Sequence, residues 1–168
     1  NRETEFGGRS ARLAIWWRPC YQVRLMDRVV IDTNIFVSAV MNANGAPRAV
    51  LRLALRREIR PIFGNALFSE YEDVLGRDAL FAGAVVGRAE REELFIALLN
   101  VSEWTPIYFL WRPNLPDEGD NHVLELAVAG GARAIITGNI RDFARGEVAF
   151  PSVKIRTAGA YLNWRRTQ

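Results

Sequence analysis

The stretch VVIDTNIFVSAV, residues 29–40, decides the fold of this 168-residue chain. It opens with three β-branched residues, which suit a short buried strand ending at Asp32. Asp32, Thr33 and Asn34 follow, and because these residue types are good helix N-caps, a helix is expected next. A buried strand that passes directly into a helix is typical of a parallel α/β sheet.

The remainder of the chain repeats this alternation. The apolar spacing predicts helices over residues 47–57, 66–75, 88–100 and 121–129, strands at 61–63, 132–137 and 154–156, and a short C-terminal helix through residues 161 and 164. Residues 106–116 hold three prolines and predict a loop around a short extended piece. Strands separated by helices imply right-handed crossovers, so we expect a mainly parallel sheet with helices on both faces.

The composition predicts one globular domain, with 49% hydrophobic and 24% charged residues. Residues 1–26 show no sustained apolar period and stop just before the first strand, so we assign them to an N-terminal extension outside the fold, with Met26 as a plausible natural start. The alternative is a basic arm that touches RNA or a partner protein. The domain is then expected to comprise residues 27–168.

Residue counts exclude several classes of protein. A single cysteine cannot form an internal disulfide, and one histidine leaves the usual Cys and His zinc sites out of reach, so a bound metal must be held mainly by oxygen. No apolar run approaches the roughly 20 residues that span a bilayer, and the first residues lack the apolar core of a secretory signal. We therefore expect a cytoplasmic protein without a membrane partner.

The net charge of +3 is weak evidence for a nucleic-acid partner. Residues 1–26 hold five Arg and two Glu, so residues 27–168 hold 17 basic and 17 acidic groups and are neutral. A local basic patch is needed instead, and Arg48, Arg52 and Arg56 form a stripe at four-residue steps on one predicted helix. The stripe predicts either contact with RNA or an acidic partner, or simply a solvated helix face.

Two polar segments follow predicted strands of the sheet. Asp32 closes the first strand, and Asn139 and Asp142 follow the strand at 132–137. Because ligands of open parallel sheets bind beyond the carboxyl ends of the strands, acids at these places carry more weight than acids elsewhere. For Asp32 an ordinary helix N-cap remains an equal alternative.

Helical spacing predicts which way the acidic side chains on two other helices point. Asp120 lies in line with the apolar positions of its helix, so it is expected to point inward, whereas His122 and Glu125 are expected on the solvent side. Asp120 and its acidic neighbours also favour a helix N-terminus, by roughly 0.3 to 1 kcal/mol each. Glu70 and Glu72 flank the apolar stripe of their helix at equal angles, so periodicity does not choose between them.

Converging carboxylates need a counter-ion. Two carboxylates about 4 Å apart repel by about 4 kcal/mol at a typical effective dielectric, and a divalent cation relieves that repulsion. Carboxylate and amide oxygens select hard ions such as Mg²⁺ or Mn²⁺. Such an ion activates water and neutralises charge on a phosphoryl group, so the chemistry that follows is phosphodiester hydrolysis.

Four segments in order resemble the PIN-domain nucleases, in particular the compact bacterial and archaeal branch described as toxins of toxin-antitoxin systems. The segments are VVIDTNIFVSAV (29–40), EYEDVL (70–75), DEGDNHVLELAVAGGA (117–132) and IITGNIRDF (135–143), and the similarity runs from residue 28 to about residue 162. Each string alone is weak. Their order and spacing together are specific.

The resemblance assigns the first two acids. The family's acid that closes the first strand falls on Asp32, with Thr33 and Asn34 completing its usual triplet. Its helical glutamate falls on Glu70, because EYEDVL aligns as a block, which separates Glu70 from Glu72.

The resemblance also assigns the acids in the second half of the chain. The third acid falls on Asp120, with Asp117 as a nearby companion. The motif that ends the last strand falls on Thr137, Asn139 and Asp142. Asn139 is an amide where the family often has a carboxylate, so the fourth acid is assigned to Asp142.

By this resemblance the chain has a three-layer α/β/α PIN-like fold and is a metal-dependent endoribonuclease acting on single-stranded RNA, with Mg²⁺ or Mn²⁺ bound by the four acids. The resemblance also implies a toxin of a type II toxin-antitoxin pair, a cognate antitoxin that masks the site, and a homodimer. The alternative is a PIN-like binding or assembly module that has lost catalysis. A phosphatase of the haloacid dehalogenase type is disfavoured, because DTN lacks the second aspartate two residues after Asp32.

Overall fold

The strands form one five-stranded sheet in which neighbouring strands run parallel, in the order β3-β2-β1-β4-β5. The computed structural model describes residues 26–84, 86–108, 120–143 and 150–168. The strands are β1 (Asp27–Ile31), β2 (Ile59–Phe63), β3 (Glu103–Trp104), β4 (Ala134–Ile136) and β5 (Lys154–Arg156). The all-parallel sheet confirms the sequence prediction.

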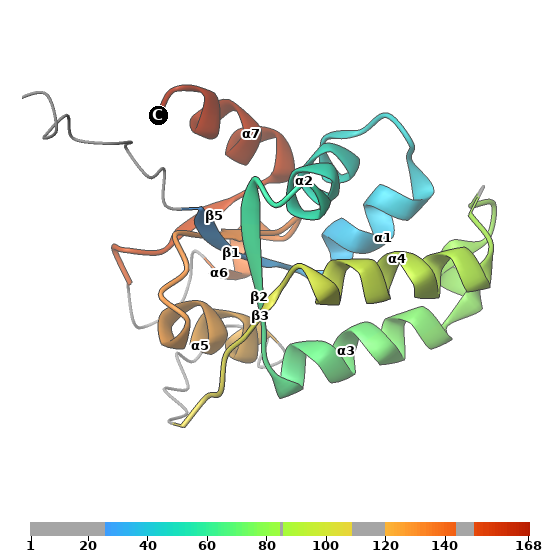
Figure 1. Ribbon diagram of the computed structural model, residues 1–168, viewed down its shortest axis with the longest axis horizontal. Helices are drawn as coiled ribbons and strands as arrows, with labels where there is room; N and C mark the ends of the chain where they lie inside the picture. The colour runs from blue at the N-terminus through green and yellow to red at the C-terminus, as the bar shows by residue number, and fades with distance from the viewer. Residues whose placement is uncertain (1–25, 85, 109–119, 144–149) are drawn as a thin grey trace, which may run out of the picture.

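Helices connect these strands and cover the sheet (Figure 1). They are α1 (Thr33–Met41), α2 (Ala46–Leu55), α3 (Asn65–Gly76), α4 (Arg88–Asn100), α5 (Asn121–Ala129), α6 (Ile140–Phe143) and α7 (Ala158–Arg166), with a 3₁₀ turn at Asp78–Phe81. The helix boundaries agree with the sequence pattern because the caps are readable in the chain. Pro47 stands in the first turn of α2, and the Thr157 hydroxyl accepts the amide of Ala160 at the start of α7.

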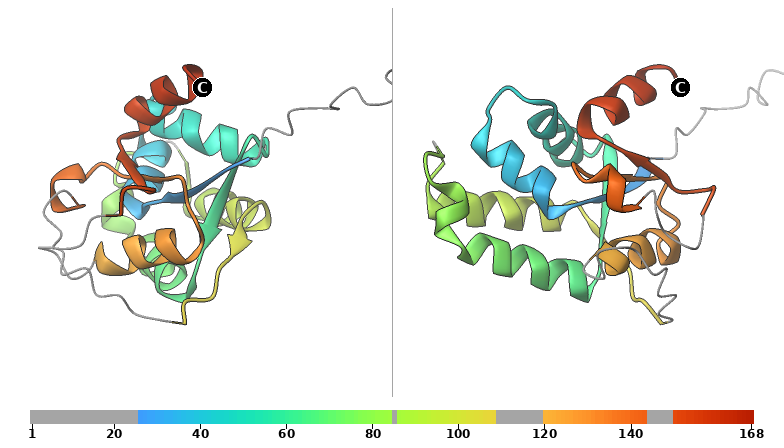
Figure 2. Two further views of the ribbon diagram at one scale, coloured as in Figure 1. Left: turned by 90° about the vertical axis from the view of Figure 1, so that its left-hand side faces the viewer. Right: turned by 180° about the vertical axis from the view of Figure 1, so that it is seen from behind.

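The sheet separates two layers of helix. Figure 1 shows α2 and α7 above β1 and α5 below it, and the view from behind in Figure 2 agrees. The connections from β1 to β2 and from β4 to β5 leave in opposite directions across the sheet. This reversal is the topological switch point of an α/β fold, and it lies at the carboxyl ends of β1 and β4. The three-layer α/β/α architecture expected from the sequence is confirmed.

The central strands are buried on both faces, so their sequences are continuous apolar runs rather than alternating ones. Val29, Val30 and Ile31 in β1 are at most 1% exposed. After α5 the chain reverses at Gly131, whose φ of +59° is a backbone conformation that glycine adopts without strain. The chain then enters β4 directly, as the Gly130-Gly131 pair predicted.

Three short elements were not expected. They are β3, the 3₁₀ turn and α6, each no longer than four residues. Elements this short carry no periodic apolar signal, so the sequence pattern cannot reveal them. Of the predicted loop at 106–116, residues 106–108 have no regular structure and the rest lies outside the described residues, as does the N-terminal segment up to residue 25. Within the described ranges, every helix is too short or too polar to cross a bilayer.

Candidate active site

The carboxyl ends of β1 and β4 lie side by side because the two strands pair in register. Ile31 pairs with Ile136, and the amide of Asp32 donates to the Ile136 carbonyl at 3.0 Å. Asp32 and Thr137, the residues that follow the two strands, are therefore neighbours at the switch point of the sheet. This position is where open α/β sheets bind their ligands.

Asp32 is a buried carboxylate, 4% exposed, whose two oxygens are both held. Its Oδ2 accepts the Thr137 hydroxyl at 2.6 Å and the Asn34 amide Nδ2 at 2.8 Å. Its Oδ1 accepts the backbone N–H of Asn34 at 3.4 Å, which makes Asp32 the N-cap of α1. The two sequence-based interpretations of Asp32, helix cap and site acid, are therefore compatible with one conformation.

Hydrogen bonds of Thr137 and Asn34 connect the residues after β4 to the first turn of α1. Thr137 is fully buried, and besides donating to Asp32 its hydroxyl oxygen accepts Asn34 Nδ2 at 3.2 Å and the Asn139 amide at 2.9 Å. Asn34 Oδ1 in turn accepts the amide of Gly138 at 2.9 Å. The loop that follows β4 is therefore fastened to the first turn of α1.

Replacing Thr137 by Val should destabilise the protein by about 2 to 3 kcal/mol, because the isosteric side chain leaves buried polar groups without their partner. The matched control is Thr105→Val, since Thr105 is also buried and its hydroxyl makes no hydrogen bond within the described part of the chain. Urea denaturation of both variants measures the difference. Equal stability losses would show that the Thr137 network adds nothing beyond packing.

Glu70 lies on α3 and faces Asp32, whereas Glu72 is exposed. The reason is that Tyr71, between them, inserts into the core and donates its hydroxyl to the carbonyl of Ile31 at 2.9 Å. Thr33 Oγ1 donates to Glu70 Oε1 at 2.6 Å and lies 3.3 Å from Asp32 Oδ1. One threonine hydroxyl therefore stands between the two carboxylates, and the geometry supports the choice of Glu70 over Glu72.

His122 also contacts Glu70, and the sequence prediction that it faces solvent is wrong. Its Nε2 lies 2.9 Å from Glu70 Oε2, and its side chain is 21% exposed. Glu125, predicted on the same solvent side, is 4% exposed. Because α5 contacts β1, β2, β4 and α3, it is buried on more than one face, so an apolar stripe alone does not identify its inward residues.

The environment shifts the two carboxyl groups in opposite directions. The pKa of Asp32 is raised, mainly because burial removes its carboxylate from water and also because Glu70 is negative, although bonds from Thr137, Asn34 and Thr33 oppose the shift. Burial by itself would raise the pKa of Glu70. The hydrogen bonds from His122 and Thr33 and the charges of His122 and Arg77 outweigh burial, so the pKa of Glu70 is lowered.

The lowered pKa of Glu70 predicts a pH-dependent stability. In metal-free buffer, Glu70→Gln should be less stable than the wild type above pH 4.5, the usual pKa of a glutamate, because only there is the stabilised carboxylate fully charged. The difference should shrink as the pH falls through the lowered pKa of Glu70 in the folded state. Thermal denaturation at pH 7 and at pH 3 measures it. A Glu70→Gln difference that stays constant with pH, like that of the exposed control Glu72→Gln, would contradict the assignment.

The remaining predicted site residues come from the chain after residue 116. Asp120 is the N-cap of α5, two residues before His122, and its Oδ2 is buried. Asn139 has an exposed side chain, and its backbone N–H donates to the Thr137 hydroxyl oxygen. Asp142 belongs to α6, directly after this loop, but its side chain, like the whole of Asp117, lies outside the described residues. The structure thus brings Asp32 and Glu70 together and leaves the roles of Asp120, Asp142 and Asp117 as predictions.

The sequence matches a model of the PIN domain over residues 28–141, which is more than half of the chain. The chain belongs to the PIN domain family. Among solved structures, this PIN domain is similar to one chain of the crystal structure of VapBC2 from Rickettsia felis bound to a DNA fragment from their promoter. The TM-score is 0.54 at 14% sequence identity, over 77% of this chain and 98% of that one, a likeness of fold. No curated protein matches the sequence.

The donor atoms at the switch point of this PIN domain fit a hard divalent cation. Asp32 and Glu70 offer carboxylate oxygens that share one hydroxyl, and the negative charge of Glu70 contributes to the raised pKa of Asp32. A cation would relieve that repulsion. Among the described side chains, no three Asp, Glu, His or Cys residues form a metal-ligand group. Asp120 is therefore not grouped with Asp32 and Glu70 as a ligand of one ion, and the predicted set of four acids, with Asp142 outside the described side chains, stays a prediction.

The three arginines of the predicted stripe, Arg48, Arg52 and Arg56, differ in exposure. Arg48 is half-buried and donates through Nη1 to the carbonyl of Ala39 at 3.1 Å, so it joins α2 to α1. Arg52 and Arg56 are exposed. Arg52 and Arg56 are therefore the most accessible of the three, and the contact of the stripe with RNA or an antitoxin stays a prediction.

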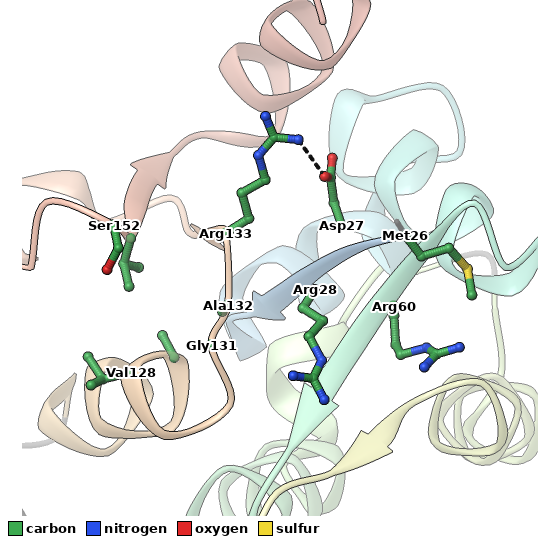
Figure 3. A pocket seen from close by; sticks show the side chains of 11 residues that line it. Met26, Asp27, Arg28, Arg60, Val128, Gly131, Ala132, Arg133 and Ser152 are labelled. Atoms are coloured by element: carbon green, nitrogen blue, oxygen red, sulfur yellow. Dashed lines mark hydrogen bonds and ion pairs between the residues drawn. The ribbon is translucent and has the colours of Figure 1, made fainter. Parts of the chain in front are cut away.

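A cavity of about 920 Å³ lies at the other end of the sheet, near the amino ends of β1, β2 and β4 (Figure 3). Each of its arginines has an acidic partner: Arg133 pairs with Asp27 at 2.7 Å, and Arg28 and Arg60 share Glu103. No predicted catalytic residue lines this cavity. Its ion pairs hold the amino ends of neighbouring strands together.

Proposed function

We propose that this PIN domain is a metal-dependent endoribonuclease that hydrolyses phosphodiester bonds of single-stranded RNA. The observation that carries the proposal is the pair of carboxylates at the switch point. Asp32 is almost fully buried, yet it faces the charged Glu70 across a single hydroxyl. The negative charge of Glu70 helps to raise the pKa of Asp32, and a bound cation would relieve that interaction.

The side chains around the pair act by orienting it. Thr137 and Asn34 hold one oxygen of Asp32, while Thr33 and His122 hold the two oxygens of Glu70. With both carboxylates fixed, the site is preorganised for a ligand that binds several oxygens at once. We propose that Asp32, Glu70, Asp120 and Asp142 bind Mg²⁺ or Mn²⁺. When bound, such an ion lowers the pKa of a water molecule and neutralises charge on the phosphate.

The proposed biological role rests on the family and on the similar solved structure. PIN domains are generally nucleases, and the similar structure from Rickettsia felis is of a VapBC complex. We therefore propose that this chain is the toxin of a type II toxin-antitoxin pair, in the cytoplasm, with a cognate antitoxin and a homodimeric assembly. Size-exclusion chromatography with light scattering tests the dimer.

Removal of metal tests the function. The purified chain should cleave a labelled single-stranded RNA in the presence of Mn²⁺ or Mg²⁺ and should lose that activity in EDTA, because the carboxylates alone supply no means to activate water at neutral pH. Activity should return when Mn²⁺ is added back, and gel electrophoresis of the RNA measures each step. RNA left intact at every metal concentration, together with no heat of Mn²⁺ binding, would favour the alternative of an inactive binding module.

A further inference from the structure

A basic groove lies between α2 and α7, away from the carboxylates. It has a volume of about 510 Å³ and is called here the α2–α7 groove. Figures 1 and 2 show the two helices side by side in every view. The lining residues are Ala49, Arg52, Leu53, Arg56, Leu162, Arg165 and Arg166.

The groove opens at the end of the sheet opposite Asp32. Arg165 donates to the carbonyl of Glu58 at 3.2 Å, and Glu58 directly precedes the amino end of β2. Asp27 pairs with Ile59 in the sheet, so five residues of β1, about 16 Å at 3.3 Å per residue, separate this level from Asp32. The residues at this end of the groove therefore lie apart from the candidate catalytic residues.

The charge of the groove is largely uncompensated. Within the described residues, Arg165 forms an ion pair with Glu58 at 3.4 Å, whereas Arg52, Arg56 and Arg166 have no carboxylate within 4.0 Å. The arginines of the cavity in Figure 3 are all paired, so this difference is local. Cations favour helix C-termini, and all four arginines stand in the last turn or at the C-cap of α2 or α7, so the two helix ends together bring them to one groove.

The floor of the groove is apolar. Leu53 and Leu162 are half-buried, and together with Ala49 they lie between the arginines. None of the described lining residues is aromatic, so the groove lacks the stacking surfaces on which single-stranded nucleic acids depend. An apolar floor with arginines around it instead matches a peptide that has an apolar anchor flanked by carboxylates, which the planar guanidinium group binds with two hydrogen bonds.

We propose that the α2–α7 groove docks an acidic segment of a partner protein, with an apolar side chain of that segment over Leu53 and Leu162. The carboxylates of the segment pair with Arg52, Arg56 and Arg166. This binding is independent of the nuclease activity, because it uses no residue of the carboxylate site.

Fluorescence anisotropy with the full chain tests the proposal. The probe is a labelled 12-residue peptide of glutamates with two central leucines, and its matched versions carry Gln for Glu or Ala for Leu. The acidic leucine peptide should bind, and the Gln version should bind at least about tenfold more weakly. A 12-nucleotide single-stranded RNA serves as the competing polyanion.

Two charge-reversed proteins locate the binding. The double variant Arg52→Glu with Arg166→Glu should weaken peptide binding at least about tenfold, because both side chains are exposed and bear on the groove. The control Arg77→Glu with Arg88→Glu makes the same change of charge at the C-cap of α3 and in the first turn of α4, and should alter binding less than about twofold. In the wild type, the arginine Nε–H signals of the groove should shift in NMR spectra when the peptide is added.

Three results would overturn the proposal. They are no binding of the acidic peptide, equal loss in the test and control variants, and RNA that displaces the peptide while binding more tightly through the same arginines. The last outcome would make the groove a polyanion site instead. The Asp32→Asn variant, which is expected to lose RNA cleavage, should bind the peptide as tightly as the wild type, so failure of this proposal is distinguishable from failure of the nuclease proposal.

Discussion

Asp32→Asn is expected to lower the rate of RNA cleavage by about a hundredfold to a thousandfold, the loss typical when one charged group of a preorganised site is removed. The substitution preserves the size of the side chain and its place at the start of α1. It removes the negative charge and puts an amide N–H where Asn34 and Thr137 now donate hydrogen bonds. Single-turnover cleavage of a labelled RNA at saturating Mn²⁺ measures the effect.

The control for Asp32→Asn is Glu72→Gln, which removes an acidic charge from the exposed face of α3. Its cleavage rate should stay within about twofold of the wild type. Circular dichroism of both variants should match the wild type, since neither change alters the apolar core. If Asp32→Asn and Glu72→Gln cleaved RNA at the same rate, Asp32 would have no part in the reaction.

Tyr71→Ala should cost about 3 to 5 kcal/mol of folding stability, the range typical for removing a buried aromatic ring. Tyr71 is 1% exposed and packs against three aromatic rings. Its ring stacks on that of Phe95 with centroids 5.1 Å apart, and it meets Phe36 and Phe63 edge-on at 5.4 and 5.1 Å. Such a cluster cannot collapse around an alanine without leaving a cavity.

The hydroxyl of Tyr71 contributes separately. Tyr71→Phe keeps the ring and removes only the hydrogen bond to the Ile31 carbonyl, so it should cost about 1 kcal/mol. Urea denaturation of the two variants separates packing from hydrogen bonding. A loss below 1 kcal/mol for Tyr71→Ala, or equal losses for both, would contradict the packing account.

The long elements of this fold were predictable because local signals and the global fold agree. The β-branched run before Asp32, Pro47 in the first turn of α2 and the glycine pair after α5 each mark a boundary that the structure keeps. The strand β3 was not predictable, because its two residues, Glu103 and Trp104, are too few to show an alternating pattern and pair with β2 through the backbone. Such an edge strand is determined by its neighbour rather than by its own sequence.

Some residues of the candidate site could be placed from the sequence, and others could not. Asp32 could be placed from the sequence because it follows a strand, and strand ends determine position in a parallel sheet. Glu70 could not be separated from Glu72 by periodicity, because what orients α3 is the buried Tyr71 and its bond to Ile31. The contact of His122 with Glu70 was missed because α5 packs against the sheet and against α3 at once.

The central claim, that these carboxylates share one divalent ion, is tested most directly by a crystal structure of the protein grown with Mn²⁺ and measured at the manganese absorption edge. The account predicts an anomalous peak at the carboxyl ends of β1 and β4, bonded to Asp32 directly or through water, with Glu70, Asp120 and Asp142 around it. Crystals that contain Mn²⁺ at saturating concentration but show no peak at this edge, or show one bound only elsewhere, would contradict it.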